Sequence, residues 1–304
     1  MKIVIIGATG FIGSRLFASL DREEYDLTVV SRDADSAREQ LDEHAEFREW
    51  DAESSADLAD IVNGAWAVIN LAGKNLASGR WTEKHKAEIL ESRTKSVDAV
   101  VEAINGAEQK PDVYIQASAI GYYGSHGNES LNENSLPGDG FLPEVTVKWE
   151  QAAKKVDKDV RLVLLRTGVV LGPEGGALQQ MVRPFKFGFG GHIGSGKQWF
   201  SWIHLDDEVR AIHFLLENPE AHGPYNLTAP VPVRMKIFAK ELGRVLKRPS
   251  WFHVPAFLIK LVMGHMGDEM LLTSQKVFPD RLTDEGFKFQ FEDIRLALTN
   301  INNS

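Results

Sequence analysis

Glycines at intervals of three residues follow an apolar run near the start of the chain. The run is residues 2–6, and the glycines are Gly7, Gly10 and Gly13. After a buried strand, the first glycine permits a tight turn, the second lets the backbone approach phosphates, and the third lets a helix pack closely on the strand. The N-terminus of that helix offers N–H groups and the positive end of its dipole to an anion. The spacing predicts a dinucleotide pyrophosphate site. The expected contact residues are Gly7, Thr9, Gly10, Phe11, Ile12 and Gly13.

The residues after the second apolar run indicate which dinucleotide is bound. The run at 27–30 is followed by Ser31 and Arg32. A fold that prefers NAD places an acidic residue here to bind the ribose hydroxyls, whereas an arginine pairs with the 2′-phosphate of NADP. Asp33 comes next, and an ordinary exposed arginine is the alternative explanation. We predict NADP(H), bound through Ser31 and Arg32.

The loops after the third and fourth apolar runs are expected to complete the nucleotide site. Their candidate residues are Asp51, Leu71, Ala72, Gly73, Lys74 and Arg80. Asp51 can accept from the adenine amino group, or it can cap the helix that begins nearby. The small residues after the fourth run let the backbone lie against adenosine and ribose. Lys74 and Arg80 either reach the phosphates or stay solvated.

The residues after the fifth apolar run are the candidates for chemistry. Ser118 is expected beside the nicotinamide, where its hydroxyl can bond a substrate carbonyl or hydroxyl, or it satisfies a backbone group at the strand end. Tyr122 or Tyr123 can donate a proton there, with simple ring packing as the alternative. His126 and His204 are further proton donors to consider. We assign Ser118 and Tyr122 as catalytic candidates.

Strand-like and helix-like segments alternate and must position these residues. The predicted strands are residues 2–6, 27–30, 46–50, 67–71, 113–117 and 161–166. The predicted helices lie around 16–20 and at 83–104, 144–156, 207–216, 236–246 and 257–266. Alternation of this kind requires crossover connections and a parallel sheet covered on both faces. The expected fold class is α/β: a Rossmann-type doubly wound parallel sheet with a small C-terminal domain on the substrate side.

The amino-acid composition changes after Gly172, where glycines and then prolines become frequent. We therefore predict a Rossmann domain of residues 1–170 and about 197–228 that binds NADP. A smaller substrate or lid domain takes about 171–196 and 229–304. The glycine-rich segment 188–196 and the following residues 197–199 are expected to line the substrate pocket.

Composition narrows the class of protein. The 304 residues carry a formal charge of −9, which argues against binding nucleic acid or an anionic membrane, because both need a basic face. No apolar run reaches the roughly eighteen residues of a membrane span. The absence of cysteine excludes disulfides and thiolate sites, and the nine histidines show no metal-ligand spacing. A cytoplasmic protein with a small-molecule substrate and no metal is expected. The apolar helix at 257–266 belongs either to the core or to an interface between subunits, so the sequence allows both a monomer and an oligomer.

Taken together, these residues resemble the extended short-chain dehydrogenase/reductases, the superfamily of the nucleotide-sugar epimerases. The resemblance rests on the glycine spacing, on Asn70–Gly73, on Ser118 to Gly124, and on Arg166 to Pro173. Nearly the full chain resembles one branch, usually called the epimerase-family proteins. That branch is marked by Arg80-Trp81-Thr82, Ser92-Arg93, Gly121–Gly124, Trp149-Glu150, Gly175–Leu178, Gly194–Trp199, Trp202–His204, Tyr225–Pro230 and the region from about Pro249.

The resemblance implies a Tyr-x-x-x-Lys pair in which tyrosine transfers the proton and lysine lowers its pKa. None of the five tyrosines here has lysine four positions later, and the helix where the pair belongs, at 140–150, contains no tyrosine. Two hypotheses follow. The first is an NADP(H)-dependent oxidoreductase or epimerase acting on a sugar or carbonyl substrate. The second is a catalytically inert NADP(H)-binding sensor or interaction protein.

Overall fold

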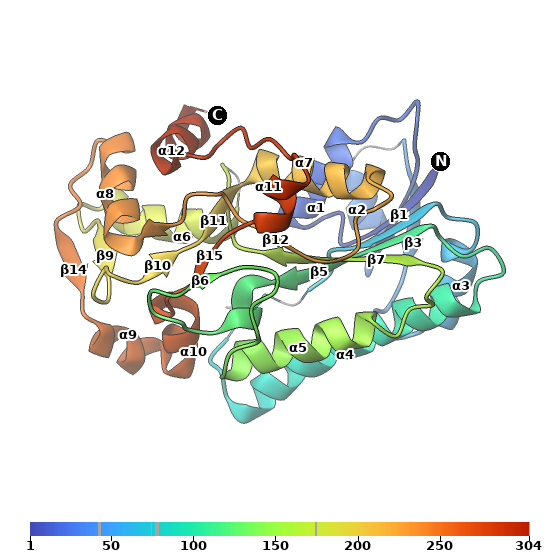
Figure 1. Ribbon diagram of the computed structural model, residues 1–304, viewed down its shortest axis with the longest axis horizontal. Coiled ribbons are helices and arrows are strands. Elements are labelled where there is room, and N and C mark those ends of the chain that lie inside the picture. The colour runs from blue at the N-terminus through green and yellow to red at the C-terminus, as the bar shows by residue number, and fades with distance from the viewer. Residues whose placement is uncertain (42–43, 74, 77–78, 174, 304) are drawn as a thin grey trace.

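A computed structural model describes residues 1–41, 44–73, 75–76, 79–173 and 175–303 (Figure 1). Its strands are β1 (Lys2–Ile6), β2 (Asp26–Ser31), β3 (Glu46–Glu49), β4 (Ala67–Asn70), β5 (Val113–Ala119), β6 (Ser130–Leu131), β7 (Arg161–Thr167), β8 (Val169–Leu171), β9 (Gly191–Ile193), β10 (Trp199–Phe200), β11 (Trp202–His204), β12 (Gly223–Leu227), β13 (Val233–Arg234), β14 (Phe252–Val254) and β15 (Lys276–Val277). Its helices are α1 (Phe11–Ser19), α2 (Ala34–Gln40), α3 (Ala56–Val62), α4 (Glu83–Gly106), α5 (Phe141–Ala153), α6 (Gly176–Lys186), α7 (Leu205–Glu217), α8 (Met235–Val245), α9 (Ala256–Met263), α10 (His265–Gly267), α11 (Asp280–Asp284) and α12 (Ile294–Asn303), with single turns η1 (Ile120–Tyr123) and η2 (Asp268–Leu272).

The central sheet has seven strands in the order β12-β7-β5-β4-β1-β2-β3, and every pair in it is parallel. The chain moves outward to one side through β2 and β3, then crosses to β4 and continues to the other side. The order therefore reverses between β1 and β4, which is where doubly wound sheets bind their ligands. The predicted α/β fold with a doubly wound parallel sheet is confirmed. The strand β12 was not predicted, because it begins with Gly223-Pro224 and contains the polar Asn226.

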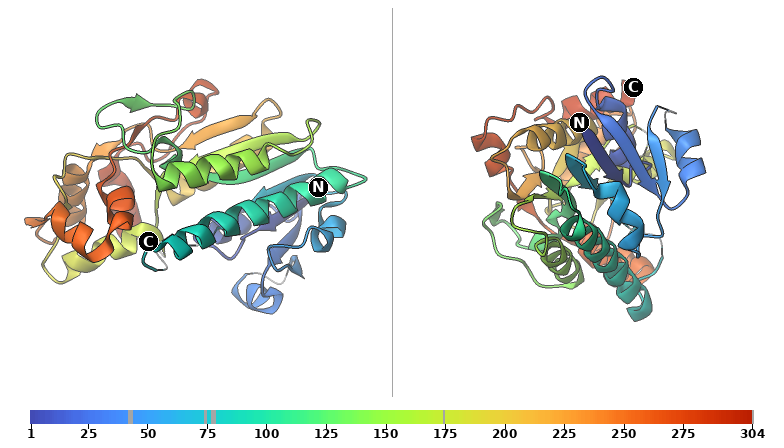
Figure 2. Two further views of the ribbon diagram at one scale, coloured as in Figure 1. Left: turned by 90° about the horizontal axis from the view of Figure 1, so that it is seen from below. Right: turned by 90° about the vertical axis from the view of Figure 1, so that its right-hand side faces the viewer.

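Helices cover both faces of this sheet, so its central strands are buried on both sides (Figures 1 and 2). On one face, α1, α2 and α7 pack against β1, β2 and β7 through side chains such as Leu16 and Ile212. On the other face, α3, α4 and α5 contribute residues that include Val100 and Trp149. Burial on both sides explains why the strands read as continuous apolar runs rather than as alternating ones.

A second core lies beyond the carboxyl ends of the strands. There α6, α8 and α12 pack around Phe200 and Trp202 of the short strands β10 and β11. The predicted division into two domains stays a prediction. The C-terminal residues contribute to both cores. Leu282 and Phe287 return to the core of the central sheet before α12 joins the second core.

Helix boundaries depart from the predicted ones where glycine intervenes. The predicted helix at 257–266 ends as α9 at Met263, because Gly264 adopts φ +58° and α10 begins after it. Among the helices described, none is both long and apolar enough to cross a membrane.

Candidate dinucleotide site

The glycine turn after β1 is packed so closely that side chains have no room. Gly7 has φ +87°, and a Cβ atom there would lie 2.8 Å from the amide nitrogen of Ala72, in the loop after β4. A Cβ atom on Gly13 would lie 2.2 Å from the carbonyl oxygen of Gly7. The tight turn and the close helix packing expected of the first and third glycines are therefore present, at the switch point of the sheet.

The helix α1 begins at this turn with its N-terminus open. Its N-cap is Gly10, which provides no side chain to cap the helix, and the first intrahelical bond runs from the Ser14 amide to the Gly10 carbonyl. The amides of Phe11, Ile12 and Gly13 belong to the first turn, where no intrahelical acceptor exists. This arrangement suits a pyrophosphate. The side chains of Thr9, Phe11 and Ile12 are half-buried beside it.

Arg32 lies exposed just after β2 and has no hydrogen bond or ion pair within the described parts of the chain. The neighbouring carboxylate is already engaged, because Asp33 is the N-cap of α2 and accepts from the Ser36 amide at 2.9 Å. The Ser31 hydroxyl accepts from the Asp33 amide at 3.3 Å. Because the Ser31 hydroxyl is the acceptor in this bond, it keeps its own hydrogen to donate, so the guanidinium and this hydroxyl are both available for a phosphate.

Asp51 is engaged in its own loop. One carboxylate oxygen accepts from the amides of Ser54 and Glu53, at 2.9 and 2.7 Å, and these bonds lower the pKa of Asp51. This geometry matches the capping alternative, although the cap closes a turn just ahead of α3 rather than the helix itself. Its contact with adenine stays a prediction.

The other predicted nucleotide contacts come from the loop after β4 and the segment beyond it. The amides of Leu71 and Ala72 bond the Ile6 carbonyl and the Asn70 side chain, which fixes this loop against the glycine turn. Gly73 and Arg80 are exposed. Lys74 lies outside the described residues.

The Ser118 hydroxyl is buried and donates to Glu150 Oε1 at 2.8 Å. Glu150, on α5, in turn accepts two hydrogen bonds from Arg166 of β7, at 2.8 and 2.9 Å. Burial alone would lower the pKa of Arg166, but the bonds to Glu150 outweigh it and raise that pKa. Because the hydroxyl serves a buried ion pair, the geometry favours a structural role for Ser118. Its partner is a side chain, not the backbone group considered from the sequence.

The same arginine organises the two tyrosines of η1. Its guanidinium carbon lies 3.5 Å from the ring centroid of Tyr122, which is half-buried. Tyr123 is fully buried; its hydroxyl donates to Asn226 at 2.7 Å and accepts from Arg166 at 3.0 Å. Burial raises the pKa of Tyr123 to about 12, so it stays protonated. Tyr123 is therefore a packed, hydrogen-bonded core residue, and Tyr122 is the more accessible phenol.

The two histidines considered as donors have local partners. His204 is buried as the N-cap of α7: its Nδ1 accepts from the Asp206 amide and its other ring nitrogen meets Asn300 at 3.2 Å. Burial lowers the pKa of His204. His126 contacts Glu129 at 3.0 Å at the surface.

Next to the end of β5, helix α5 presents Leu142 and Thr146, and neither residue can act as the tyrosine or the lysine of a Tyr-Lys pair. A Cβ atom on Gly121, just after β5, would lie 3.5 Å from both Leu142 Cβ and Thr146 Oγ1. These two positions are four apart, and the Thr146 hydroxyl donates back to the Leu142 carbonyl at 2.7 Å. Glu269 of η2 accepts from the first two amides of α5, at 2.8 and 2.7 Å, and so ties the C-terminal region to this helix.

Two features of the site were missed from the sequence. Gly172, Gly175 and Gly176 enclose the Phe11 ring, so a Cβ atom on any of them would come within 2.7 to 2.9 Å of it. The glycine cluster was visible, but its partner at the start of α1 was not. The Glu150–Arg166 pair was likewise hidden, because its members stand on separate elements and each is a common surface residue.

A cavity of about 380 Å³ lies on the side predicted for the substrate. Gly194, Ser195 and Gln198 of the glycine-rich region line it, together with Ser125 and α9. Trp199 instead packs under Arg234, whose guanidinium lies 3.9 Å from the indole centroid. Within the described ranges, no cluster of three or more His, Asp or Glu side chains is placed to hold a metal ion.

Comparison with known proteins identifies the family to which this chain belongs. Residues 3–228 match the model of the NAD dependent epimerase/dehydratase family, and residues 254–301 match a domain of unknown function, DUF1731. An Arabidopsis thaliana protein named "Epimerase family protein SDR39U1 homolog, chloroplastic" is 42% identical over 98% of this chain and 86% of its own length. The Bacillus subtilis "Epimerase family protein YfhF" is 38% identical over 99% of this chain and 98% of its own.

Solved structures agree with this relationship. Human epimerase family protein SDR39U1, crystallised with NADPH, superposes with a TM-score of 0.89 and 32% identity over the whole of both chains. A nucleoside-diphosphate sugar epimerase from Corynebacterium glutamicum gives 0.77 and 28%, covering 99% of this chain and 58% of its own. The chain therefore belongs to the NAD-dependent epimerase/dehydratase family, among the relatives called epimerase family proteins.

Proposed function

We propose that this protein binds NADP(H) at the glycine turn and uses it as an oxidoreductase. The observation that carries the cofactor choice is Arg32, which stands exposed and unpartnered in the described structure beside Asp33, whose carboxylate is engaged as a helix cap. The cradle fits the group: Gly7 and Gly13 leave no room for a Cβ atom, and the N-terminus of α1 has no side-chain cap. The human relative crystallised with NADPH supports this choice.

The proposed substrate is a sugar or another small carbonyl or carbinol compound. Bound nicotinamide supplies hydride exchange at carbon. The chain must supply the proton, and Tyr122 is our candidate, because its half-buried ring lies beneath the Arg166 guanidinium at the carboxyl end of the sheet. We retain Ser118 as a second candidate, acting through its bond to Glu150. The cytoplasmic location stays a prediction.

A specific observation also supports a non-catalytic function. The face of α5 next to the end of β5 carries Leu142 and Thr146, neither of which can take the roles of a Tyr-Lys pair. Such a protein would bind NADP(H) as a redox sensor or as part of an interaction. A measurement of turnover therefore distinguishes the oxidoreductase from the non-catalytic protein, whereas a measurement of nucleotide affinity does not.

The cofactor assignment is tested by Arg32→Glu, with Arg38→Glu as a matched control on the exposed side of α2. Titration of NADPH and NADH by calorimetry should show Arg32→Glu weakening NADPH by roughly 2–3 kcal/mol, about 30- to 150-fold, because a charge-assisted contact is lost. NADH affinity should change little. Equal losses for both nucleotides, or an equal effect of Arg38→Glu, would contradict the assignment.

Oxidation of bound NADPH against a panel of carbonyl compounds and sugars tests the reaction. Tyr122→Phe should slow turnover at least tenfold while leaving NADPH affinity intact, because it removes a proton donor and not a phosphate contact. Turnover unaffected by Tyr122→Phe excludes this tyrosine. Inertness across the panel favours the non-catalytic function.

A further inference from the structure

Large apolar side chains gather, exposed, at one end of the molecule. Trp251 and Phe187 are each 78% exposed and Leu261 is 77% exposed. They come from the loop before β9, from the residues around β14, and from α9. β14 pairs with β9, and the rings of Phe189 and Phe252 lie 5.9 Å apart, so the segments adjoin. We call the following set the apolar end: Phe187, Phe189, Trp251, Phe252, Phe257, Leu258, Leu261 and Val262.

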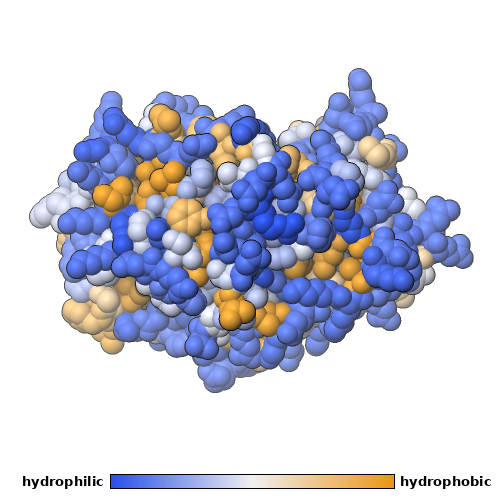
Figure 3. Space-filling model, in the orientation of Figure 1, coloured by the Kyte–Doolittle hydropathy of each residue, from blue (hydrophilic) through white to orange (hydrophobic). Residues whose placement is uncertain are grey.

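The helix α9 is the most apolar of the exposed segments that form this surface. Seven of its eight residues are apolar, Lys260 is the exception, and none of them is buried. A surface helix ordinarily turns one apolar stripe to the core and polar residues to water. Figure 3 shows apolar residues over α9 at the lower left of the molecule, and Figures 1 and 2 agree that α8, β14 and α9 form that end. Exposed apolar surface of this extent marks an interaction site.

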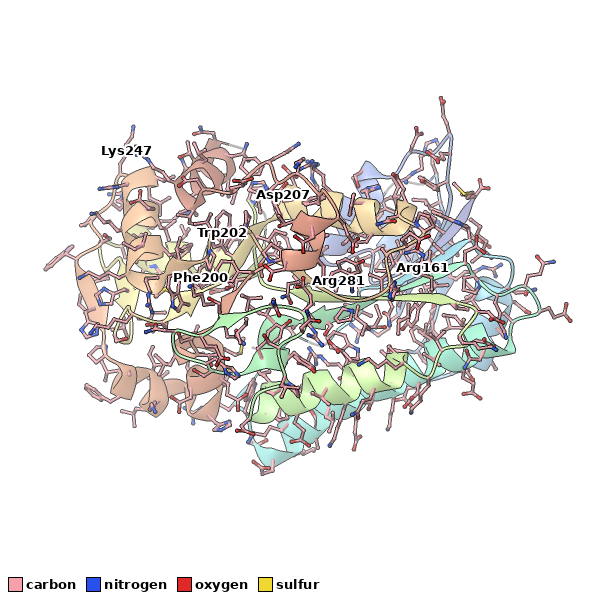
Figure 4. All side chains as sticks on the ribbon, in the orientation of Figure 1. Arg161, Phe200, Trp202, Asp207, Lys247 and Arg281 are labelled. Carbon is pink, nitrogen blue, oxygen red and sulfur yellow. The ribbon has the colours of Figure 1, made fainter. Side chains whose placement is uncertain are left out.

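The charge around the apolar end is opposite to that of the whole protein. Residues 232–263 contain seven Lys and Arg but one Glu, a net charge of +6, whereas the chain as a whole carries −9. The exposed cations Lys236, Lys240 and Arg244 lie on α8, and Lys247 and Arg248 follow it. Figure 4 labels Lys247 at the tip of α8, at the same end of the molecule. Glu241 pairs with Arg244 at 2.7 Å and Asp268 pairs with Lys260 at 2.9 Å, so Lys236, Lys240, Lys247 and Arg248 carry the positive charge of this face despite the acidic total.

We infer that this end docks on the surface of a bilayer that contains anionic lipids. Exposed tryptophan, phenylalanine and leucine side chains enter the boundary between head groups and acyl chains, and lysine and arginine attract anionic head groups. Pairing of this end with itself in a second copy would instead bring two segments of +6 together, which opposes a symmetric dimer.

Docking in this way would place the predicted substrate side next to the lipid. The cavity of about 380 Å³ has Ala256 and Lys260 of α9 in its wall. The glycine turn lies on a different element, after β1 in the central sheet, and needs no part of α9. The inference therefore stands independently of the proposed function, and each can fail alone.

Flotation with lipid vesicles tests the inference, using the full chain without nucleotide. We expect co-flotation with vesicles of phosphatidylcholine and phosphatidylglycerol, much less with phosphatidylcholine alone, and release as salt rises. The double variant Phe257→Ser, Leu261→Ser should lower binding roughly tenfold or more. Lys247→Glu with Arg248→Glu should abolish the preference for the anionic lipid.

Leu136→Ser is the matched control, because Leu136 is 80% exposed but lies in the segment between β6 and α5. It should bind vesicles as the parent does. Circular dichroism melts show whether each variant is folded. Three results would overturn the inference: no flotation of the folded parent with anionic vesicles, equal losses with Leu136→Ser, or a parent dimer by light scattering that Phe257→Ser, Leu261→Ser dissociates.

Discussion

A buried carboxyl group in α7 should make the stability of this protein fall as pH rises. Glu208 is 0% exposed, and Thr167 at the end of β7 donates to its Oε1 at 2.7 Å. Its Oε2 has no hydrogen-bond partner in the described structure, and no cation is paired with it there. Burial raises the pKa of Glu208 from its ordinary 4.5 to about 8. The folded protein therefore holds this side chain as a neutral acid at pH 7.

The sign and size of the effect follow from linkage. The unfolded chain releases this proton near pH 4.5, while the folded chain keeps it until about pH 8. Between those values, each pH unit lowers the free energy of unfolding by about 1.4 kcal/mol. The loss reaches about 3 kcal/mol at pH 7 and levels off near 5 kcal/mol above pH 8. This stability is fully present below pH 4.5 and is lost as pH rises through the pKa of the folded state.

The variant Glu208→Gln isolates the effect, because an amide keeps the shape and can still bond Thr167 but does not titrate. Urea unfolding at pH 5, 6, 7 and 8 should show the variant more stable than the parent by about 3 kcal/mol at pH 7, and by under 1 kcal/mol at pH 5. Glu220→Gln, an exposed glutamate beyond α7, is the control and should leave the pH profile unchanged. A difference between parent and Glu208→Gln that is constant with pH would refute the reasoning.

Three further predictions concern packing and ion pairs near the site. Gly13→Ala places a methyl group 2.2 Å from the Gly7 carbonyl oxygen, so thermal melts should show a loss of about 1–3 kcal/mol, and NADPH binding should weaken; a melt like the parent's would contradict this packing. Arg166→Met removes both arginine bonds to the buried Glu150 carboxylate, which keeps the Ser118 bond and a Lys154 contact at 3.8 Å, and should cost about 3–5 kcal/mol in urea unfolding, part of which the added change Glu150→Gln restores. Glu269→Gln weakens the cap on α5 by about 1 kcal/mol, and faster proteolysis of the C-terminal region should accompany it; unchanged cleavage would show that the cap does not hold that region.

The sheet was predictable because most of its strands are apolar runs that can be recognised in the sequence. A parallel strand covered on both faces is mostly apolar, so the run before Gly7 stands out against polar helical segments, as does the start of β5 at residues 113–115, ahead of Gln116 and Ser118. β12 failed this test because it begins with Gly223-Pro224 and its buried half contains Asn226. Asn226 is tolerated there because its side chain accepts from Tyr123 and donates to the Phe278 carbonyl, partners far away in sequence. No local pattern carries that information.

The candidate site likewise has a part that local sequence predicts and a part that depends on residues far apart in the chain. The glycine spacing is a local signal: the backbone that excludes a side chain at Gly13 belongs to the same turn, although the backbone that crowds Gly7 comes from the loop after β4. The assignment of Ser118 needed knowledge of Glu150, which is distant along the chain and appears in sequence as one more acidic residue on a polar helix face. Sequence reasoning therefore located the strand end and its hydroxyl but not the acceptor that holds it.

The composition argument against an anionic membrane rests on total charge, whereas the proposed docking depends on local charge. A total of −9 describes the force on a distant charge, but at contact distance the field is set by groups within about 10 Å, the screening length near physiological salt. The segment that carries +6 also carries the exposed α9, so its charges act together with its apolar side chains. A bilayer at this end would therefore meet a basic, apolar surface, and the vesicle experiment tests whether that surface binds anionic lipid.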